Sequence, residues 1–598
     1  MKTSDKIFAL LCGVIVVVFA AQRIERHLEK KAWEKDRMER IAIDFRRSRE
    51  EVKDYISRYI PEVTDAQIDE WTASGKLEAM EIDGQTRYFR NAGPNLFRID
   101  HECEAIKAAS DVAEGSISLS GNALDGHDAD DAAVIPLIVS KVKSNLLAGP
   151  SAAGTAGTAA GASSDGAAVG TSGSAAGSDA SSAADTSASA TTASPAGAVA
   201  PSTSASAAAP AAGSSDASPF ARTAPTPYMA EPRHYHVRYT LTVDADAVPA
   251  GETVRCWLPY PRKDVPRQGD VHFIAASEPK YVFSEESCAH STLYMEKKAV
   301  AGQPTVFSEE FEYTIYGEWH PLYPESVKEY NVSDPEYKHY TSEREAHIKF
   351  TPRIKAVADS LSKGLDNPYL IARTFFTWVN DNFPWASARE YSTVENIPMY
   401  VLESGHGDCG MVTLLFMTLC RYKGIPTRWQ SGFMMHPSGW NLHDWAEVYF
   451  EGPGWVPVDE SFGIPSYAVR RSSLMGTWAP AMSLPAASGA GGAAVSGASG
   501  TAGTSGTGAS VSSSSSASAS TLGGDPVLSA ILALPEAEYF YLGGIDPYRM
   551  IVNADYGQYL SPRKKYPRSE TVDFQRGEVE WKGGNLYFNK WSYSLEIL

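Results

Sequence analysis

Cysteine is scarce in this sequence, with six residues among 598, and none belongs to a Cys-x-x-Cys pair. Structural zinc sites need such short ligand spacings, and an N-terminal leader that contains Cys12 would leave an odd number of cysteines once removed. We therefore expect neither a disulfide scaffold nor a metal site, and at least one free thiol. Cys256 and Cys288 are the pair that could join in an oxidising compartment, which their spacing alone does not decide.

Positive charge is also in short supply. The chain has 53 Lys and Arg against 72 Asp and Glu, a formal net charge of -19. Such a chain repels phosphate backbones, and it has no basic stripe interleaved with aromatic residues, so nucleic acid is not expected as a partner. The acidic run from Asp125 to Asp131 lacks the ligand spacing of a calcium loop, and no cofactor is predicted.

Long apolar runs are absent except at the N-terminus, where Ile7 to Ala21 is unbroken. As a helix this run would span about 22 Å, which is less than a bilayer core of about 30 Å and favours a signal peptide cleaved after Ala20 or Ala21. The basic residues that follow, beginning at Arg23, would also suit a short anchor that associates with a membrane. We expect residues 1–21 to be this leader, and the protein to be exported, periplasmic or attached to the cell envelope.

The rest of the chain changes character several times. Two tracts consist almost wholly of Ala, Ser, Gly, Thr and Pro without a structural period, which predicts disordered linkers. Alternation such as Tyr235, Val237 and Tyr239 predicts an antiparallel β-sandwich, and beyond Pro352 the apolar period becomes helical. The predicted organisation is an N-terminal helical stalk and small folded segment (22–148), a disordered linker (149–225), the β-sandwich domain (226–320), the core that carries the chemistry (345–485), a disordered insertion (486–524) and a β-rich C-terminal extension of that core (525–598).

One cysteine stands at a predicted helix start. Apolar residues at helical spacing follow Asp408, a good N-cap, and Gly424 with Pro426 should end the helix. This places Cys409 in the first turn, where the helix dipole and free backbone N–H groups favour thiolate over thiol. Cys420 lies in the middle of the same helix among apolar residues, so we interpret it as inert core.

A β-hairpin is predicted next, with its turn at Glu451 to Gly454. His443 lies near the start of its first strand and Asp459 near the end of its second. An imidazole oriented by a carboxylate can take a thiol proton and later return it to a leaving amine. If the turn is centred between Gly452 and Pro453, Asp459 lies opposite Ala446, and contact with His443 would need a bulge or strong twist.

These elements in this order resemble the transglutaminase-like superfamily of bacterial exported proteins, which has a papain-type fold. The residues that carry the resemblance are Cys409, the Gly-Ile-Pro motif from Gly424 to Pro426, His443, Trp445, Glu447, Gly454, Trp455, Asp459 and the preceding helix from Ala372 to Asn382. The resemblance implies an α+β core over 345–485 with Cys409 as nucleophile, His443 as general base and acid, and Asp459 as orienting carboxylate. The family has a small or aromatic residue where this chain has Asp444, which adds a negative charge. The oxyanion donor is left open among Tyr391, Tyr400 and the backbone N–H of Cys409.

The function predicted from this resemblance is acyl transfer on the amide or peptide carbonyl of a protein or peptide substrate, through a thioester on Cys409. An amine acceptor would make the protein a transglutaminase and water would make it a peptidase or amidase, which the sequence does not decide. The alternatives are a non-catalytic envelope module that keeps the fold, and a metal site of Cys409, His436 and His443. His406 and His436 are the competing bases, but no strand leads from either of them to a carboxylate. The oligomeric state is not readable.

Overall fold

The computed structural model describes residues 34–35, 37–113, 128–148, 226–461 and 539–598. The predicted leader (1–21), the linker (149–225) and the insertion (486–524) lie outside these residues. In the part of the chain that the structure describes, no helix is both long and apolar enough to cross a bilayer.

Residues 37–113 build a small module around a core of their own. Ser48 and Thr64 each form a capping box, with Glu51 and Gln67 respectively, and these boxes start the helices α2 and α3. Ile41 and Phe45 are buried in this core, so the segment expected to be a helical stalk is part of a folded module from there on. The elements of the module are α2 (Arg49–Ile56), α3 (Asp65–Ala73), β1 (Ala79–Ile82), β2 (Gln85–Tyr88), α4 (Ala92–Ile99) and α5 (His101–Ala113).

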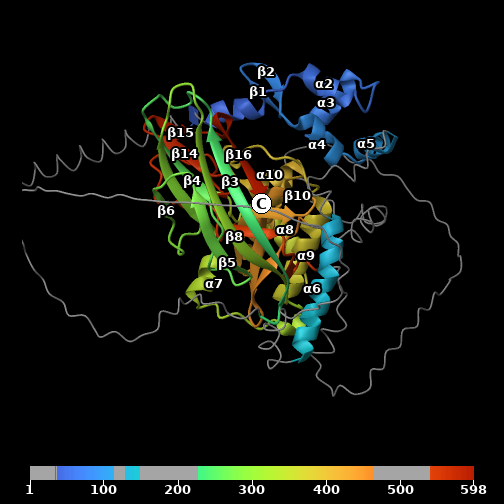
Figure 1. Ribbon diagram of the computed structural model, residues 1–598. Helices are drawn as coiled ribbons and strands as arrows, with labels where there is room; N and C mark the ends of the chain where they lie inside the picture. Colours follow the sequence, from blue (N-terminus) through green and yellow to red (C-terminus); the bar gives the residue numbers. More distant parts are fainter. Residues whose placement is uncertain (1–33, 36, 114–127, 149–225, 462–538) are drawn as a thin grey trace, which may run out of the picture. The chain divides into compact units, whose positions relative to one another are not determined.

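Two five-stranded antiparallel sheets follow, and their buried residues form one hydrophobic core. Burial alternates strictly along β8, as the period of two predicts, and β8 pairs with β3 over most of their lengths (Figure 1). One sheet has the order β12-β8-β3-β16 with β5 beside β8, and the other is β15-β14-β4-β7-β6. The strands from this part of the sequence are β3 (Met229–Val243), β4 (Thr253–Pro259), β5 (Gln268–Ala276), β6 (Tyr281–Phe283), β7 (Thr292–Lys298) and β8 (Thr305–Trp319).

The predicted core (345–485), joined by short elements before it and by β13 after it, contains helices and a four-stranded sheet of order β11-β10-β9-β13. Thr351 and Asn367 cap helices that begin with proline, as the sequence indicated. The elements are η1 (Pro324–Ser326), α7 (Pro335–Tyr340), α8 (Pro352–Leu361), α9 (Pro368–Asn382), η2 (Tyr391–Thr393), α10 (Ile397–Ser404), α11 (Cys409–Tyr422), β9 (Thr427–His436), β10 (Gly439–Phe450) and β11 (Gly454–Val458). The helix α6 (Asp128–Ala148) adds its buried side chains to the same core.

The C-terminal segment is shared between these parts rather than belonging only to the predicted core. Its strand β13 pairs with β9 in the four-stranded sheet. The other strands complete the two five-stranded sheets, with β12 on β8, β16 on β3 and β14 on β4. The elements are β12 (Gly544–Ile545), β13 (Arg549–Asn553), β14 (Glu578–Trp581), β15 (Gly584–Leu586), η3 (Phe588–Lys590) and β16 (Trp591–Ile597).

Candidate active site

The helix that carries Cys409 starts where the sequence predicts. Asp408 is the N-cap of α11, and its Oδ1 accepts a hydrogen bond of 3.1 Å from the backbone N–H of Met411. The helix ends before Gly424, which has a left-handed φ of 73°. Cys420 is fully buried inside α11, as expected for a core residue.

The Cys409 sulfur faces β10, where its hydrogen-bond partner among the described residues is Asp444 rather than the imidazole of His443. Sγ lies 3.7 Å from Asp444 Oδ2, and Cys409 is partly exposed. Removal from water raises the pKa of the Cys409 thiol well above its ordinary value, and the charges of Asp444 and Asp408 raise it further. The expectation that the helix start favours thiolate is therefore wrong for the resting site, because desolvation and two neighbouring acids outweigh the helix dipole.

His443 and Asp459 are brought into direct contact. His443 Nε2 lies 2.6 Å from Asp459 Oδ2, and both side chains are fully buried. A carboxylate can only accept, so Nε2 carries the hydrogen and Nδ1 is the basic nitrogen of the neutral ring. This is the tautomer that a general base acting through Nδ1 requires.

The hairpin register explains how this contact forms. Ala446 pairs with Val458, which places the next residue, Asp459, opposite Trp445. The turn expected from the sequence had placed Asp459 opposite Ala446. A shift of one residue moves a side chain to the other face of a sheet. In the observed register Asp459 and His443 share a face as diagonal neighbours, within reach of each other without a bulge.

Arg549 of β13 completes this group, and no motif in the sequence indicated it. Its Nη1 donates to Asp459 Oδ2, and its Nε donates to Asp546 Oδ2 over 2.8 Å. Burial by itself would raise the pKa of Asp459, but the Arg549 guanidinium and the hydrogen bonds from His443 and Ser461 hold it well below its usual range. Burial lowers the pKa of His443 despite the Asp459 charge, and Arg549 lowers it as well. The resting pair is therefore a neutral imidazole beside a carboxylate.

Tyr391 and Tyr400, the two side chains considered as hydrogen-bond donors to the oxyanion, have different partners. Tyr391 of η2 donates from its hydroxyl to Asp408 Oδ1 over 2.5 Å, and this hydroxyl is 3.5 Å from Asp444 Oδ2. Tyr400 instead bonds to Glu78 of the N-terminal module over 3.1 Å. Of the two, Tyr391 is the one that reaches Asp444, the hydrogen-bond partner of the thiol.

The competing histidines are not brought to the sulfur by any described contact. His406 is buried, desolvation lowers its pKa to about 4, and its ring lies edge-on to Tyr400 at 6.1 Å. His436 ends β9 with its ring 4.5 Å from that of Tyr548. Within the described residues there is no group of three potential metal ligands, and the five cysteines there, Cys256 and Cys288 included, form no disulfide.

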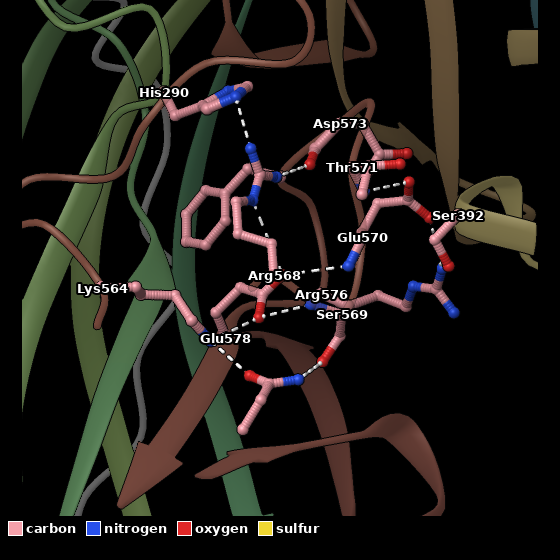
Figure 2. Close-up of polar contacts among 12 residues, drawn as sticks. His290, Ser392, Lys564, Arg568, Ser569, Glu570, Thr571, Asp573, Arg576 and Glu578 are labelled. Carbon is pink, nitrogen blue, oxygen red and sulfur yellow. Dashed lines mark hydrogen bonds and ion pairs between the residues drawn. The ribbon is translucent and has the colours of Figure 1, made fainter. Parts of the chain in front are cut away.

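A loop of the C-terminal segment also contacts His443 and Asp444. Gln575 Nε2 donates to the His443 carbonyl oxygen over 2.7 Å and to Asp444 Oδ1 over 2.8 Å. Figure 2 shows the neighbouring Glu570, Asp573 and Arg576 in the network that holds this loop. Gln575 is separated from Asp444 by 131 residues, so no local pattern could have indicated the contact.

Comparison with known proteins places the site within a family. Residues 355–460, which include Cys409, His443 and Asp459, match the family described as the transglutaminase-like superfamily. No curated protein sequence matches the chain.

Solved structures resemble the chain at low identity. A proposed cysteine protease from Cytophaga hutchinsonii is 15% identical with a TM-score of 0.32, over 40% of this chain and 80% of that one. The periplasmic domain of TgpA from Pseudomonas aeruginosa is 14% identical with a TM-score of 0.22, over 40% of this chain and 90% of that one. A proposed protease from Parabacteroides distasonis is 10% identical with a TM-score of 0.18, over 32% and 41% of the two chains.

Proposed function

Because residues 355–460 form a transglutaminase-like domain, we propose that this protein catalyses acyl transfer from amide or peptide carbonyls, with Cys409 as nucleophile. The observation that carries the proposal is the buried His443–Asp459 hydrogen bond of 2.6 Å on the strand that Cys409 faces. A base held in a defined tautomer by a carboxylate, on the strand that a helix-start thiol contacts, supports thiol acyl transfer.

In the proposed reaction the thiol proton passes to Nδ1 of His443 as Sγ attacks the carbonyl carbon. The pKa of the Cys409 thiol is raised and that of the His443 imidazole is lowered, so both groups are uncharged before the reaction. The proton therefore moves from sulfur to imidazole as the sulfur attacks. The proton then moves from His443 to the leaving amine, which departs and leaves a thioester on Cys409. An amine or water resolves the thioester, giving a cross-link in the first case and hydrolysis in the second.

Arg549 and Asp459 serve this reaction by holding the imidazole. Asp459 stabilises the imidazolium that forms after proton transfer, and Arg549 keeps Asp459 ionised although it has no exposed surface. The backbone N–H of Cys409, at the start of α11, is the donor that we propose for the oxyanion.

Alkylation resolved by site tests the nucleophile. The wild type and His443→Ala are treated with iodoacetamide, and mass spectrometry follows Cys409, with the partly exposed Cys288 as internal control. We expect the variant to label Cys409 more slowly by about a hundredfold, the usual worth of a general base, with Cys288 unchanged. Labelling of Cys409 that does not depend on His443 would instead support the non-catalytic envelope module.

Substrate assays then separate the two acceptors. A glutamine-containing peptide is incubated with a fluorescent primary amine, and ammonia release and amine incorporation are both measured. Incorporation identifies a transglutaminase, whereas ammonia release or peptide cleavage without incorporation identifies a hydrolase. We also propose export to the cell envelope on the basis of the apolar run from Ile7 to Ala21, which fractionation against a periplasmic marker tests.

A further inference from the structure

Asp444 follows His443 on β10, and the fold builds a place for its carboxyl group against the nucleophile. Oδ2 faces Cys409 Sγ at 3.7 Å, and Oδ1 accepts from Gln575 Nε2 at 2.8 Å. Asp444 is only 3% exposed, and both of its carboxyl oxygens have hydrogen-bond partners, so its side chain is held against the sulfur.

Gly410 makes room for this carboxyl group. A Cβ atom at position 410 would lie 2.6 Å from Asp444 Oδ2 and 3.0 Å from the Trp429 ring, and it would collide with the Tyr391 hydroxyl. The first turn of α11 therefore approaches Asp444 and Tyr391 so closely only because residue 410 has no side chain. The contact between Asp444 and the sulfur depends on this approach.

The charged surroundings of Asp444 are mostly acidic. The groups that face it are Cys409 and Asp408 from α11, Tyr391 from η2, and Glu570, Asp573 and Gln575 from the C-terminal loop. Arg576 pairs with Glu570 at 3.5 Å and Arg568 with Glu578 at 3.6 Å (Figure 2). Within the described part of the chain, no lysine or arginine forms an ion pair with Asp444 itself.

Burial raises the pKa of Asp444 well above its ordinary value, and the charges of Asp573, Asp408 and Glu570 raise it further. The same causes raise the pKa of Asp573 to about 8 and that of Asp408 to about 6. A protonated carboxyl is an O–H donor, whereas a carboxylate only accepts and repels a neighbouring anion.

We propose that Asp444 is a further catalytic residue that tunes the nucleophile: while protonated, its carboxyl group donates a hydrogen bond to the thiolate that forms when His443 takes the Cys409 proton, and once ionised, its carboxylate accepts from the S–H group and opposes formation of the thiolate. In the second state the S–H group donates to Oδ2. In both states the thiol proton leaves for His443 Nδ1, so the S–H bond breaks and an N–H bond forms, but only the protonated carboxyl can donate to the thiolate that results. The acyl transfer of this site consequently weakens as pH rises through the range in which Asp444 ionises. This inference rests on the proposed role of Cys409 as nucleophile.

The test is the pH dependence of Cys409 alkylation in wild type, Asp444→Asn and Asp444→Ala, with iodoacetamide between about pH 5 and about pH 9. Asn keeps the shape and an N–H donor but never ionises, and Ala has neither donor nor charge. We expect Asp444→Asn to label like the wild type at acidic pH and at least about tenfold faster at alkaline pH, because one unit charge next to the sulfur is removed. Asp444→Ala should label more slowly than the wild type at acidic pH and faster at alkaline pH.

A ratio of Asp444→Asn to wild-type rates that is constant over the whole range would show a purely structural role and overturn the proposal. Slower labelling of Asp444→Asn at alkaline pH would overturn it as well. The result stays separate from the proposed function, because His443→Ala is measured in the same series. If Cys409 is alkylated no faster in the wild type than in His443→Ala, the role of Cys409 as nucleophile is refuted, whatever the Asp444 variants show.

Discussion

Substitution of Arg549 is the strictest test of the buried charges that hold His443 in place. Its guanidinium bridges Asp459 and Asp546, and the side chains of all three residues have no exposed surface. Arg549→Met keeps the side-chain bulk but leaves two buried carboxylates without their cation. Breaking a buried ion pair from one side costs about 3–5 kcal/mol, a large share of a total free energy of unfolding of about 5–15 kcal/mol.

The loss should depend on pH with a definite sign. In the wild type the pKa of folded Asp459 is depressed, so its contribution to stability is present at neutral pH and is lost as pH falls through the folded value. Without Arg549 the burial of Asp459 is no longer offset by this cation, and keeping it ionised becomes costly as pH rises. The difference in free energy of unfolding between wild type and variant should therefore grow from acidic to neutral pH.

Urea unfolding followed by tryptophan fluorescence at several pH values measures this difference. Arg428→Met is the matched control, because Arg428 pairs with Glu447 on the same sheet but its side chain is 27% exposed. A partly exposed pair is worth about 1 kcal/mol or less. The reasoning is refuted if Arg549→Met costs no more than Arg428→Met, or if its cost is the same at acidic and neutral pH.

Two further substitutions test other parts of the site. Gly410→Ala should displace Tyr391 and Asp444, because its Cβ atom would overlap both side chains. We expect this to lower the free energy of unfolding by about 1–3 kcal/mol and to slow Cys409 alkylation. Unchanged thermal unfolding would contradict the close contact between Gly410 and these two side chains. Burial and the Asp459 charge raise the pKa of Glu460 to about 8, so the folded state binds more protons than the unfolded chain in the range below that value, and stability falls as pH rises there. Glu460→Gln should therefore stabilise the protein by about 2–3 kcal/mol at neutral pH and by almost nothing near about pH 4, which denaturant unfolding at the two pH values would show.

The sequence by itself determined the local elements of the site. The N-cap at Asp408, the helix end at Gly424 and the hairpin turn at Glu451 to Gly454 all lie where the residues predicted them. Caps and turns depend on hydrogen bonds between residues a few positions apart, so the signal is complete within a short window. The alternation along β8 is visible for the same reason, because burial of one sheet face imposes a period of two.

Only the tertiary structure decided which side chains surround the thiol. The register that puts Asp459 on the face of His443 differs by one residue from the expected one, and a turn signal does not resolve such a difference. Arg549 is 90 residues from Asp459, and Gln575 is 131 residues from Asp444. These contacts exist because β13 pairs with β9 and because the C-terminal loop is anchored by strands of another sheet, a result of burial and strand pairing over the whole chain. The same long-range packing outweighs the helix dipole and raises the pKa of Cys409, since desolvation depends on everything that surrounds the sulfur rather than on its neighbours in sequence.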